Sequence, residues 1–245
     1  MKRLYGKLPA RIDPRTLKLA DYLPRALPPA PSSIDWSGNI LNWQMLGNDQ
    51  VGDCTCAAAL HLDMDWCSNT RIPFAPTTAD ALAAYSAITG YNPANPATDQ
   101  GACEIDVLNF WRQTGMAGRK IGSYASVDVT RQDHVQAAIA LFGGLYIGIQ
   151  VPSSADDEFE SGQPWTDLAD TNIEGGHAVP LVGYTEFGPT CITWGQKQLM
   201  SWAWLAARGD EGYAVFSPDW LNATGISPSN LNQPQLLADL AAVTA

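Results

Sequence analysis

The sequence predicts an α+β protein, and the order of the patterns along the chain indicates this class. Residues recur at helical spacing in the first half, whereas alternating and continuous apolar runs typical of strands come mostly after Gly115. Helices that precede strands, instead of alternating with them, favour α+β over α/β architecture. With 46% hydrophobic residues, the 245-residue chain can bury a sizeable core, as one large domain or two tightly joined small ones.

Three helices are expected in the first half of the chain. The residues that precede them favour helix starts: Asp53 is a good N-cap type for the first, and Thr77 or Thr78 can cap the second. Gly115 supplies the stop of the third. The expected helical ranges are 54–66, 77–88 and 103–114.

Strands dominate the second half, where apolar residues alternate or run together. The runs that predict strands are 121–129, 145–151, 177–184, 190–195 and 212–216. The helices expected among and after them are 130–141, with a capping-box-like start at Thr130, then 198–207 and 235–243. Residues 152–176 are expected to form a long polar loop.

The N-terminal region has the composition of a basic arm. Residues 1–25 have a net charge of +5, which leaves −16 for the rest of a chain whose total is −11. The stretch Pro28-Pro29-Ala30-Pro31 predicts a stiff extended linker, and a short helix is possible over 15–22. We expect residues 1–30 to lie outside the compact core, so that their removal leaves folding intact. The arm can dock on its own acidic body, dock on another acidic protein, or remain a solvated tail, while the acidic body argues against nucleic acid as a ligand.

The chain is therefore divided into four parts. Residues 1–33 form the basic, proline-rich arm, and 34–120 form a helical subdomain. Residues 121–217 form a β-rich subdomain, and 218–245 form a C-terminal tail. No apolar run approaches the roughly 20 residues that span a bilayer, and no apolar signal-peptide core follows the basic N-terminus. We therefore expect a cytoplasmic protein that makes no membrane contact.

The stretch 47–61 is where the chemistry is expected. Cys54 falls in the first turn of the expected 54–66 helix, at the positive end of the helix dipole, which favours thiolate over thiol. The alternative is an ordinary buried helix in which cysteine serves as a small hydrophobe. A nucleophilic thiol also needs a base, and the chain has three histidines. His61 lies about 10 Å along the helix from Cys54 and His134 falls in a surface helix, so elimination leaves His177, which opens an apolar strand.

A metal site is the competing use of these residues. The pair Cys54 and Cys56 is C-x-C, and neither a second C-x-x-C nor an H-x-x-x-H cluster accompanies it. These spacings fit no common zinc site, so neither a metal nor any other cofactor is expected. Without export, the five cysteines are expected to be free thiols.

Several stretches of the chain resemble motifs of the papain-like cysteine peptidases and follow each other in the same order as in that family. The resemblance is to a divergent bacterial or phage-type member. The stretch 31–36, Pro-Ser-Ser-Ile-Asp-Trp, is similar to the mature N-terminus P-x-S-x-D-W of those enzymes. From Trp36, the family's offsets of twelve and eighteen residues reach Asn48 and Cys54. Residues 176–184, Gly-His-Ala-Val-Pro-Leu-Val-Gly-Tyr, resemble G-H-A-V-x-x-V-G-Y. The remaining similar stretches are 52–57, 100–103, 193–195 and 210–215.

The resemblance implies a fold and a set of roles. The fold would be a helical subdomain packed against an antiparallel β-barrel-like subdomain, with the active-site cleft between them. Cys54 would be the nucleophile and His177 its base, while the Asn48 side chain and the Cys54 backbone N–H would form the oxyanion hole. Trp194 would cover the hydrogen bond behind the histidine. Three further residues would line the substrate cleft beside Trp194: Gly101, Ala102 and Ala178.

Three positions depart from the family pattern. Asn48 stands in place of Gln and is one methylene shorter, and Asp53 replaces the usual Ser beside the nucleophile. Thr193 has the family's offset of sixteen from the histidine, where an orienting Asn is usual. The 33 Pro-rich residues of the arm are not expected to replace the helices of the family's long inhibitory prodomain.

The sequence therefore supports two alternative functions. The first is a cysteine peptidase or amidase that cleaves peptide or amide bonds through an acyl-enzyme. The second is a non-catalytic structural or interaction protein with the same fold, such as a phage virion or capsid-associated protein, with the arm bound to a protein partner. The retained pair of Cys54 and His177 favours the enzyme, and the altered residues favour the structural role.

Overall fold

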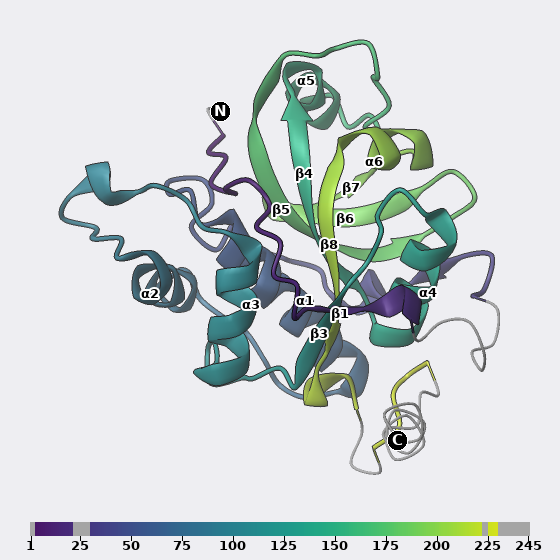
Figure 1. The fold of residues 1–245 in the computed structure, drawn as a ribbon, viewed down its shortest axis with the longest axis horizontal. Coiled ribbons are helices and arrows are strands. Elements are labelled where there is room, and N and C mark those ends of the chain that lie inside the picture. Colours follow the sequence, from purple (N-terminus) through teal and green to yellow (C-terminus); the bar gives the residue numbers. More distant parts are fainter. Residues whose placement is uncertain (1–2, 22–29, 222–224, 230–245) are drawn as a thin grey trace.

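The computed structural model describes residues 3–21, 30–221 and 225–229. Figure 1 shows two halves, with helices α1–α3 on one side and the strands of a large sheet on the other. The expected tail helix over 235–243 lies outside the described residues. Among those residues, we find no helix that is both long enough and apolar enough to cross a bilayer.

The helical half is built on α1, which spans Cys54–Thr70. Fourteen of its residues are buried, because α1 lies between the other helices and the sheet. Such all-round burial explains the run of Ala57, Ala58 and Ala59, since small side chains let neighbouring elements approach from every direction. Helix α2 (Thr78–Thr89) begins with a capping box on Thr77, and α3 (Glu104–Gln113) follows the Gly101–Ala102 turn.

The sheet has eight strands, and α+β is confirmed as the class. Its order is β1-β3-β8-β4-β5-β6-β7, with β2 paired to β5 away from this path. The strand bounds are Leu17–Lys18 (β1), Ile34–Asp35 (β2), Ser123–Ser126 (β3), Leu145–Pro152 (β4), Ile173–Tyr184 (β5), Pro189–Thr193 (β6), Gln196–Leu199 (β7) and Gly209–Phe216 (β8). Apart from the parallel pair of β1 and β3, the strands pair antiparallel. The sheet is open, with β1 and β7 at its edges, and does not close into the barrel implied by the resemblance.

Shorter elements complete the fold around the sheet. Helix α4 spans Gln132–Phe142, α5 spans Ser153–Glu160 and α6 spans Trp202–Arg208. Single 3-10 turns lie at Leu19–Asp21, Ser37–Asn39, Pro96–Thr98 and Pro218–Trp220. The core consists of two apolar clusters, one on the helical side and one around the sheet. The last 3-10 turn contributes Trp220 to the first cluster, and α6 contributes Trp204 to the second.

Several elements differ from the sequence expectation. The expected polar loop 152–176 contains α5, whose two apolar residues at helical spacing, Ala155 and Phe159, are too few to predict a helix. Tertiary contacts hold it: Asp170 accepts hydrogen bonds from Ser153 and Ser154, and Trp165 donates to the Ala155 carbonyl. Strand β7 occupies the start of the helix expected at 198–207, because residues 196–199 pair with β6. The expected capping box at Thr130 is absent, since the residue before α4 is Arg131 and makes no side-chain cap.

The expectation that residues 1–30 lie outside the core is wrong for part of the arm. The Leu19 side chain packs in the core cluster around the sheet, and Lys7 is 5% exposed. In place of the helix that was possible over 15–22, the chain forms β1, which pairs with β3, and then a 3-10 turn. Opposite charges explain this docking, because Arg3 pairs with Asp156 at 2.8 Å.

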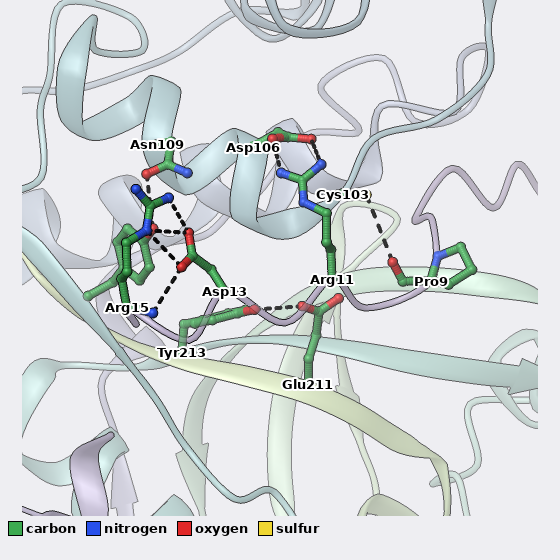
Figure 2. A network of polar contacts seen from close by, with 10 residues as sticks. Pro9, Arg11, Asp13, Arg15, Cys103, Asp106, Asn109, Glu211 and Tyr213 are labelled. Atoms are coloured by element: carbon green, nitrogen blue, oxygen red, sulfur yellow. Dashed lines mark hydrogen bonds and ion pairs between the residues drawn. The ribbon is translucent and has the colours of Figure 1, made fainter. Parts of the chain in front are cut away.

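The next part of the arm also docks on the chain's own body. Figure 2 shows Arg11 reaching Asp106 on α3, and Arg15 paired with Asp13 within the arm. Cys103 donates weakly to the Pro9 carbonyl at 3.8 Å. Of the alternatives that the charge distribution left open, the described part of the arm therefore follows the first, docking on its own acidic body.

Candidate active site

The thiol of Cys54 begins helix α1 and is 1% exposed. Backbone N–H groups of Ala178 and Gly6 hydrogen-bond its sulfur. Burial nevertheless raises the pKa of the Cys54 thiol to about 12, because the two N–H groups offset only part of the desolvation and the neighbouring carboxyl of Asp53 adds to it. In the closed state that the structure describes, the thiol is therefore neutral near pH 7.

Asp53 stands at the N-cap position of α1 but does not cap the helix. Its side chain is fully buried, and neither carboxyl oxygen has a hydrogen-bond partner among the described residues. Burial raises the pKa of Asp53 well above its usual value, and the charges of Asp99 and Asp49 raise it further. While Asp53 is protonated it places no full negative charge beside Cys54, and its ionisation would raise the pKa of the thiol further.

The imidazole of His177 lies on β5 and is 1% exposed. Its Nε2 is 2.8 Å from Oγ1 of Thr193, at the end of β6. The indole of Trp194 stacks on the imidazole with ring centroids 4.9 Å apart and an interplanar angle of 15°. Thr193 therefore fixes the ring orientation, and Trp194 shields that hydrogen bond from water.

The turn between β6 and β7 explains how Trp194 reaches this place. Thr193 pairs with Gln196, which leaves a two-residue hairpin loop. Trp194 and Gly195 have φ angles of 45° and 73°, as in the type I′ turn that suits the twist of a hairpin. A positive φ at a bulky aromatic residue is strained, and strain of this kind is concentrated at functional sites.

The other ring nitrogen of His177 makes no hydrogen bond within the described residues. Nδ1 is buried and has no hydrogen-bond partner among the described residues, so the structure records no bond between it and the Cys54 thiol. Burial lowers the pKa of His177 to about 3, and the positive charge of Arg3 lowers it further. The imidazole is neutral, with its free nitrogen available to accept a proton.

Asn48, the expected oxyanion residue, is buried beside the start of α1. Its amide Nδ2 lies 3.4 Å from the carbonyl oxygen of Leu4 and 3.4 Å from that of Val51. The shorter side chain therefore still directs its amide at a carbonyl group, that of Leu4. That carbonyl belongs to the N-terminal segment, which we define as residues 3–9.

The N-terminal segment is bonded to both sides of the site. Ala102 donates to the Gly6 carbonyl at 2.8 Å and accepts from Leu8 at 3.0 Å. On the opposite side, Lys7 donates to the Gly176 carbonyl at 3.0 Å. Ala102, which was expected to line the substrate cleft, and Gly176 therefore hold a stretch of the chain's own backbone. Figure 1 shows this stretch descending between the helices and the sheet.

Side chains of the segment cover the histidine. The Tyr5 ring meets the His177 ring edge-on at 6.0 Å, and its hydroxyl donates to Asp156 at 2.8 Å. The Arg3 guanidinium lies over the rings of Phe159 and Trp194 at 4.7 and 4.4 Å. Cys54 and His177 are thus covered by residues that precede them by more than forty positions.

Gly6 makes the closest approach of the segment to the body. A Cβ atom at this position would lie 1.7 Å from the Gly52 carbonyl oxygen, a distance that no real side chain adopts. Gly101 shows the same crowding from the other side, since its Cβ would lie 2.3 Å from the Gly6 carbonyl oxygen. The segment fits only because glycine stands at both positions.

Sequence patterns did not reveal this coverage. The basic composition of residues 1–25 indicated docking on an acidic surface, but no local pattern links Gly6 to Gly52. The other histidines are apart from the site: His61 Nε2 lies 2.9 Å from the Trp43 carbonyl oxygen, and His134 is on α4. The five cysteines are free thiols, and no group of three or more His, Cys, Asp or Glu within the described residues could hold a metal ion.

The fold has counterparts of known structure. Xylellain, a cysteine protease from Xylella fastidiosa, matches with a TM-score of 0.65 at 18% identity, over 89% of this chain and 98% of that one. The bromelain protease from Ananas comosus matches with a TM-score of 0.56 at 15% identity, over 76% and 99% of the two chains. The chain has a papain-like fold. No family model and no curated protein matches the sequence.

A third structure extends the papain-like group. The cysteine protease and lectin-like domains of Cwp84, a surface layer associated protein of Clostridium difficile, match with a TM-score of 0.61 at 10% identity, over 88% of this chain and 57% of that one. At such low identities these similarities establish the fold alone. The resemblance found in the sequence motifs is confirmed at that level, and the chemistry has to be argued from the site.

Proposed function

We propose that the protein is a cysteine peptidase or amidase whose active site is closed by its own N-terminal segment. The observation that carries the proposal is the arrangement around His177, which is oriented by Thr193, shielded by Trp194 and one residue from the Ala178 N–H that bonds the Cys54 sulfur. An ordinary buried histidine does not require a strained tryptophan over a single hydrogen bond.

The reaction follows from these positions. Nδ1 of His177 takes the thiol proton of Cys54, and the thiolate attacks the carbonyl carbon of the substrate. The Cys54 N–H and the Asn48 amide bind the resulting oxyanion. The imidazolium then gives its proton to the leaving amine as the C–N bond breaks, which leaves a thioester on Cys54. Water, deprotonated by His177, hydrolyses the thioester and restores the thiol.

Displacement of the N-terminal segment is the step that permits this chemistry. Removing it hydrates the site, so that the burial that raises the pKa of Cys54 and lowers the pKa of His177 is relieved. It also removes the positive charge of Arg3, which opposes an imidazolium, and frees the Asn48 amide from the Leu4 carbonyl. The hydration of the site and the loss of the Arg3 charge both favour a thiolate–imidazolium pair.

The non-catalytic alternative, a phage virion or other structural protein, makes a different prediction. In that case Cys54 is only a buried apolar residue, and opening the site creates no activity. No contact of the described residues favours this role over the catalytic one.

Hydrolysis of fluorescein-labelled denatured casein tests the proposal. The full chain carrying Gly6→Ala is expected to cleave casein, because the added Cβ excludes the segment from the site. Gly38→Ala is the matched control, since a Cβ at Gly38 meets nothing within 4 Å and leaves the site closed. Cleavage by Gly6→Ala that disappears on adding Cys54→Ser supports the proposal, and equal rates with and without Cys54 overturn it.

A further inference from the structure

The deepest contact of the N-terminal segment is the side chain of Lys7. That side chain has no exposed surface, and its Nζ lies 3.0 Å from Asp210 Oδ2 and 2.8 Å from Glu211 Oε1. Nζ also donates to the Leu8 carbonyl at 3.1 Å. The buried ammonium group therefore donates two hydrogen bonds, to Asp210 and the Leu8 carbonyl, and forms an ion pair with Glu211.

Two glycines make the space for Lys7, one beside its side chain and one beside its backbone. A Cβ on Gly148, in the middle of β4, would lie 1.9 Å from Lys7 Cε, and one on Gly176 would lie 2.5 Å from the Lys7 carbonyl oxygen. Neither glycine has a positive φ, so the backbone does not require glycine there. Because glycine weakens a strand, its presence within the apolar run of β4 is explained by the space that it leaves open.

The buried space around the Lys7 side chain, which we call the Lys7 pocket, contains more carboxyl groups than positive charges. Glu104, at the start of α3, is fully buried, and neither of its carboxyl oxygens has a hydrogen-bond partner in the described part of the chain. Burial alone would lower the pKa of Lys7, but the charges of Glu104, Glu211 and Asp210 outweigh it and raise that pKa. The Tyr213 hydroxyl holds the second oxygen of Glu211 at 2.8 Å. The pocket is thus built for a positive charge.

The pocket adjoins the reacting thiol. Lys7 directly follows Gly6, whose N–H bonds the Cys54 sulfur. The backbone groups that hold this part of the segment, at Ala102 and Gly176, are ones that any extended peptide can use. A peptide that replaces the segment along them therefore places a side chain in the same pocket.

We propose that this pocket selects a Lys or Arg side chain in the peptide substrate, one residue away from the backbone unit that lies at Cys54. The inference rests on the proposed function and names its substrate class. When the segment leaves, the carboxyls of Asp210 and Glu211 lose their counter-charge, and a basic side chain restores it. A neutral side chain leaves the carboxylates uncompensated, and an acidic one adds repulsion.

Peptide binding measures this selectivity apart from catalysis. The full chain with Gly6→Val is used, because the valine side chain cannot lie against Gly52. The probe is a fluorescein-labelled peptide with the sequence of residues 3–10, carrying Lys, norleucine or Glu at the position of Lys7, and binding is followed by fluorescence anisotropy. We expect the Lys peptide to bind at least tenfold more tightly than the norleucine peptide, and the Glu peptide to bind more weakly than both.

Two further variants assign the selectivity to the pocket. Adding Asp210→Asn and Glu211→Gln is expected to remove the preference for Lys. Asp156→Asn, which touches Arg3 and Tyr5 but not Lys7, is the matched control and should keep the preference. Equal binding of the Lys and norleucine peptides would overturn the proposal.

Hydrolysis of internally quenched peptides of the same three kinds separates this inference from the proposed function. Faster cleavage of Lys and Arg peptides supports the inference. Equal cleavage of all peptides overturns it and leaves the peptidase intact. Selective binding without any cleavage would refute the peptidase, and with it the role of the pocket in substrate choice, and would leave the pocket as an anchor for Lys7.

Discussion

Oγ1 of Thr193 lies 2.8 Å from Nε2 of His177, in the place where the papain-like pattern leads one to expect an amide. A hydroxyl can both donate and accept, so it holds the ring whichever nitrogen carries the proton. This relationship is the basis of the first prediction.

Thr193→Val removes the hydroxyl and keeps the shape of the side chain. We expect the rate of casein cleavage in the Gly6→Ala background to fall about tenfold to hundredfold, the equivalent of one hydrogen bond of about 1–3 kcal/mol. Thr193→Ser should keep most of the rate. Thr190→Val, a half-buried position on the same strand, serves as the control. A Thr193→Val rate equal to that of the control would exclude an orienting role for Thr193.

Gly148→Ala should loosen the N-terminal segment without touching Cys54 or His177. Its Cβ would overlap Lys7 Cε, so the side chain has to leave its pocket. We expect faster digestion of the segment by added trypsin at Lys7, by at least tenfold over the wild-type chain, as measured by mass spectrometry. Gly38→Ala should digest at the wild-type rate, and a Gly148→Ala chain as resistant as wild type would contradict the tight fit.

Asp53→Asn tests the buried carboxyl beside the nucleophile. Because burial raises the pKa of Asp53 in the folded protein, its contribution to stability is complete below about pH 4 and is lost as the pH rises toward the folded value. The free energy of unfolding of the Asn variant, relative to wild type, should therefore increase by up to about 1.4 kcal/mol per pH unit above pH 4. Denaturant unfolding at pH 4.5, 5.5 and 6.5 measures it.

The exposed Asp157 provides the matched control for that series. Asp157→Asn should change the free energy of unfolding by less than about 0.5 kcal/mol at every pH. A flat difference between Asp53→Asn and wild type across the same range would show that Asp53 is ionised alike in the folded and unfolded chain.

His61 should make the protein less stable in acid. Its Nε2 lies between the carbonyl oxygens of Trp43 and Gln44, and burial lowers its pKa to about 4. The unfolded chain takes up a proton near pH 6.5 and the folded chain does not, so stability is lost as the pH falls from about 6.5 to 4. Relative to wild type, His61→Gln should gain up to about 1.4 kcal/mol per pH unit over that range.

Denaturant unfolding at pH 7, 6, 5 and 4 measures the difference between His61→Gln and wild type. Since both chains retain His177, its own titration cancels in the comparison. A difference that does not change with pH would mean that the His61 imidazole titrates alike in the folded and unfolded chain, which contradicts the lowered pKa.

Much of the site was accessible from the sequence, because its parts are local. A helix that starts at Cys54, a strand through His177 and a turn at Trp194 each carry their own pattern, and their order along the chain matches that of the papain-like enzymes. Helix α5 was missed because its only support is tertiary, from Trp165 and Asp170.

The coverage of the site was missed for a related reason. Gly6 meets Gly52 across 46 residues, and the Lys7 pocket is assembled from β4, β8 and α3, so no stretch of sequence contains either contact. The unfavourable pKa of Cys54 follows from the same coverage, whereas the position of the thiol at a helix start indicated the opposite direction. Long-range burial outweighed the local effect of the helix dipole.

The most direct test of the catalytic pair is the rate of Cys54 alkylation by iodoacetamide against pH, read by peptide mass. In the full chain with Gly6→Ala, we predict a rate that is already high at pH 5–6 and that falls at least tenfold when His177→Ala is added. The Gly38→Ala chain should react slowly throughout, since its site stays closed. A Gly6→Ala rate that rises only near pH 8.5, as for an ordinary thiol, and that ignores His177→Ala would contradict an activated thiolate–imidazolium pair.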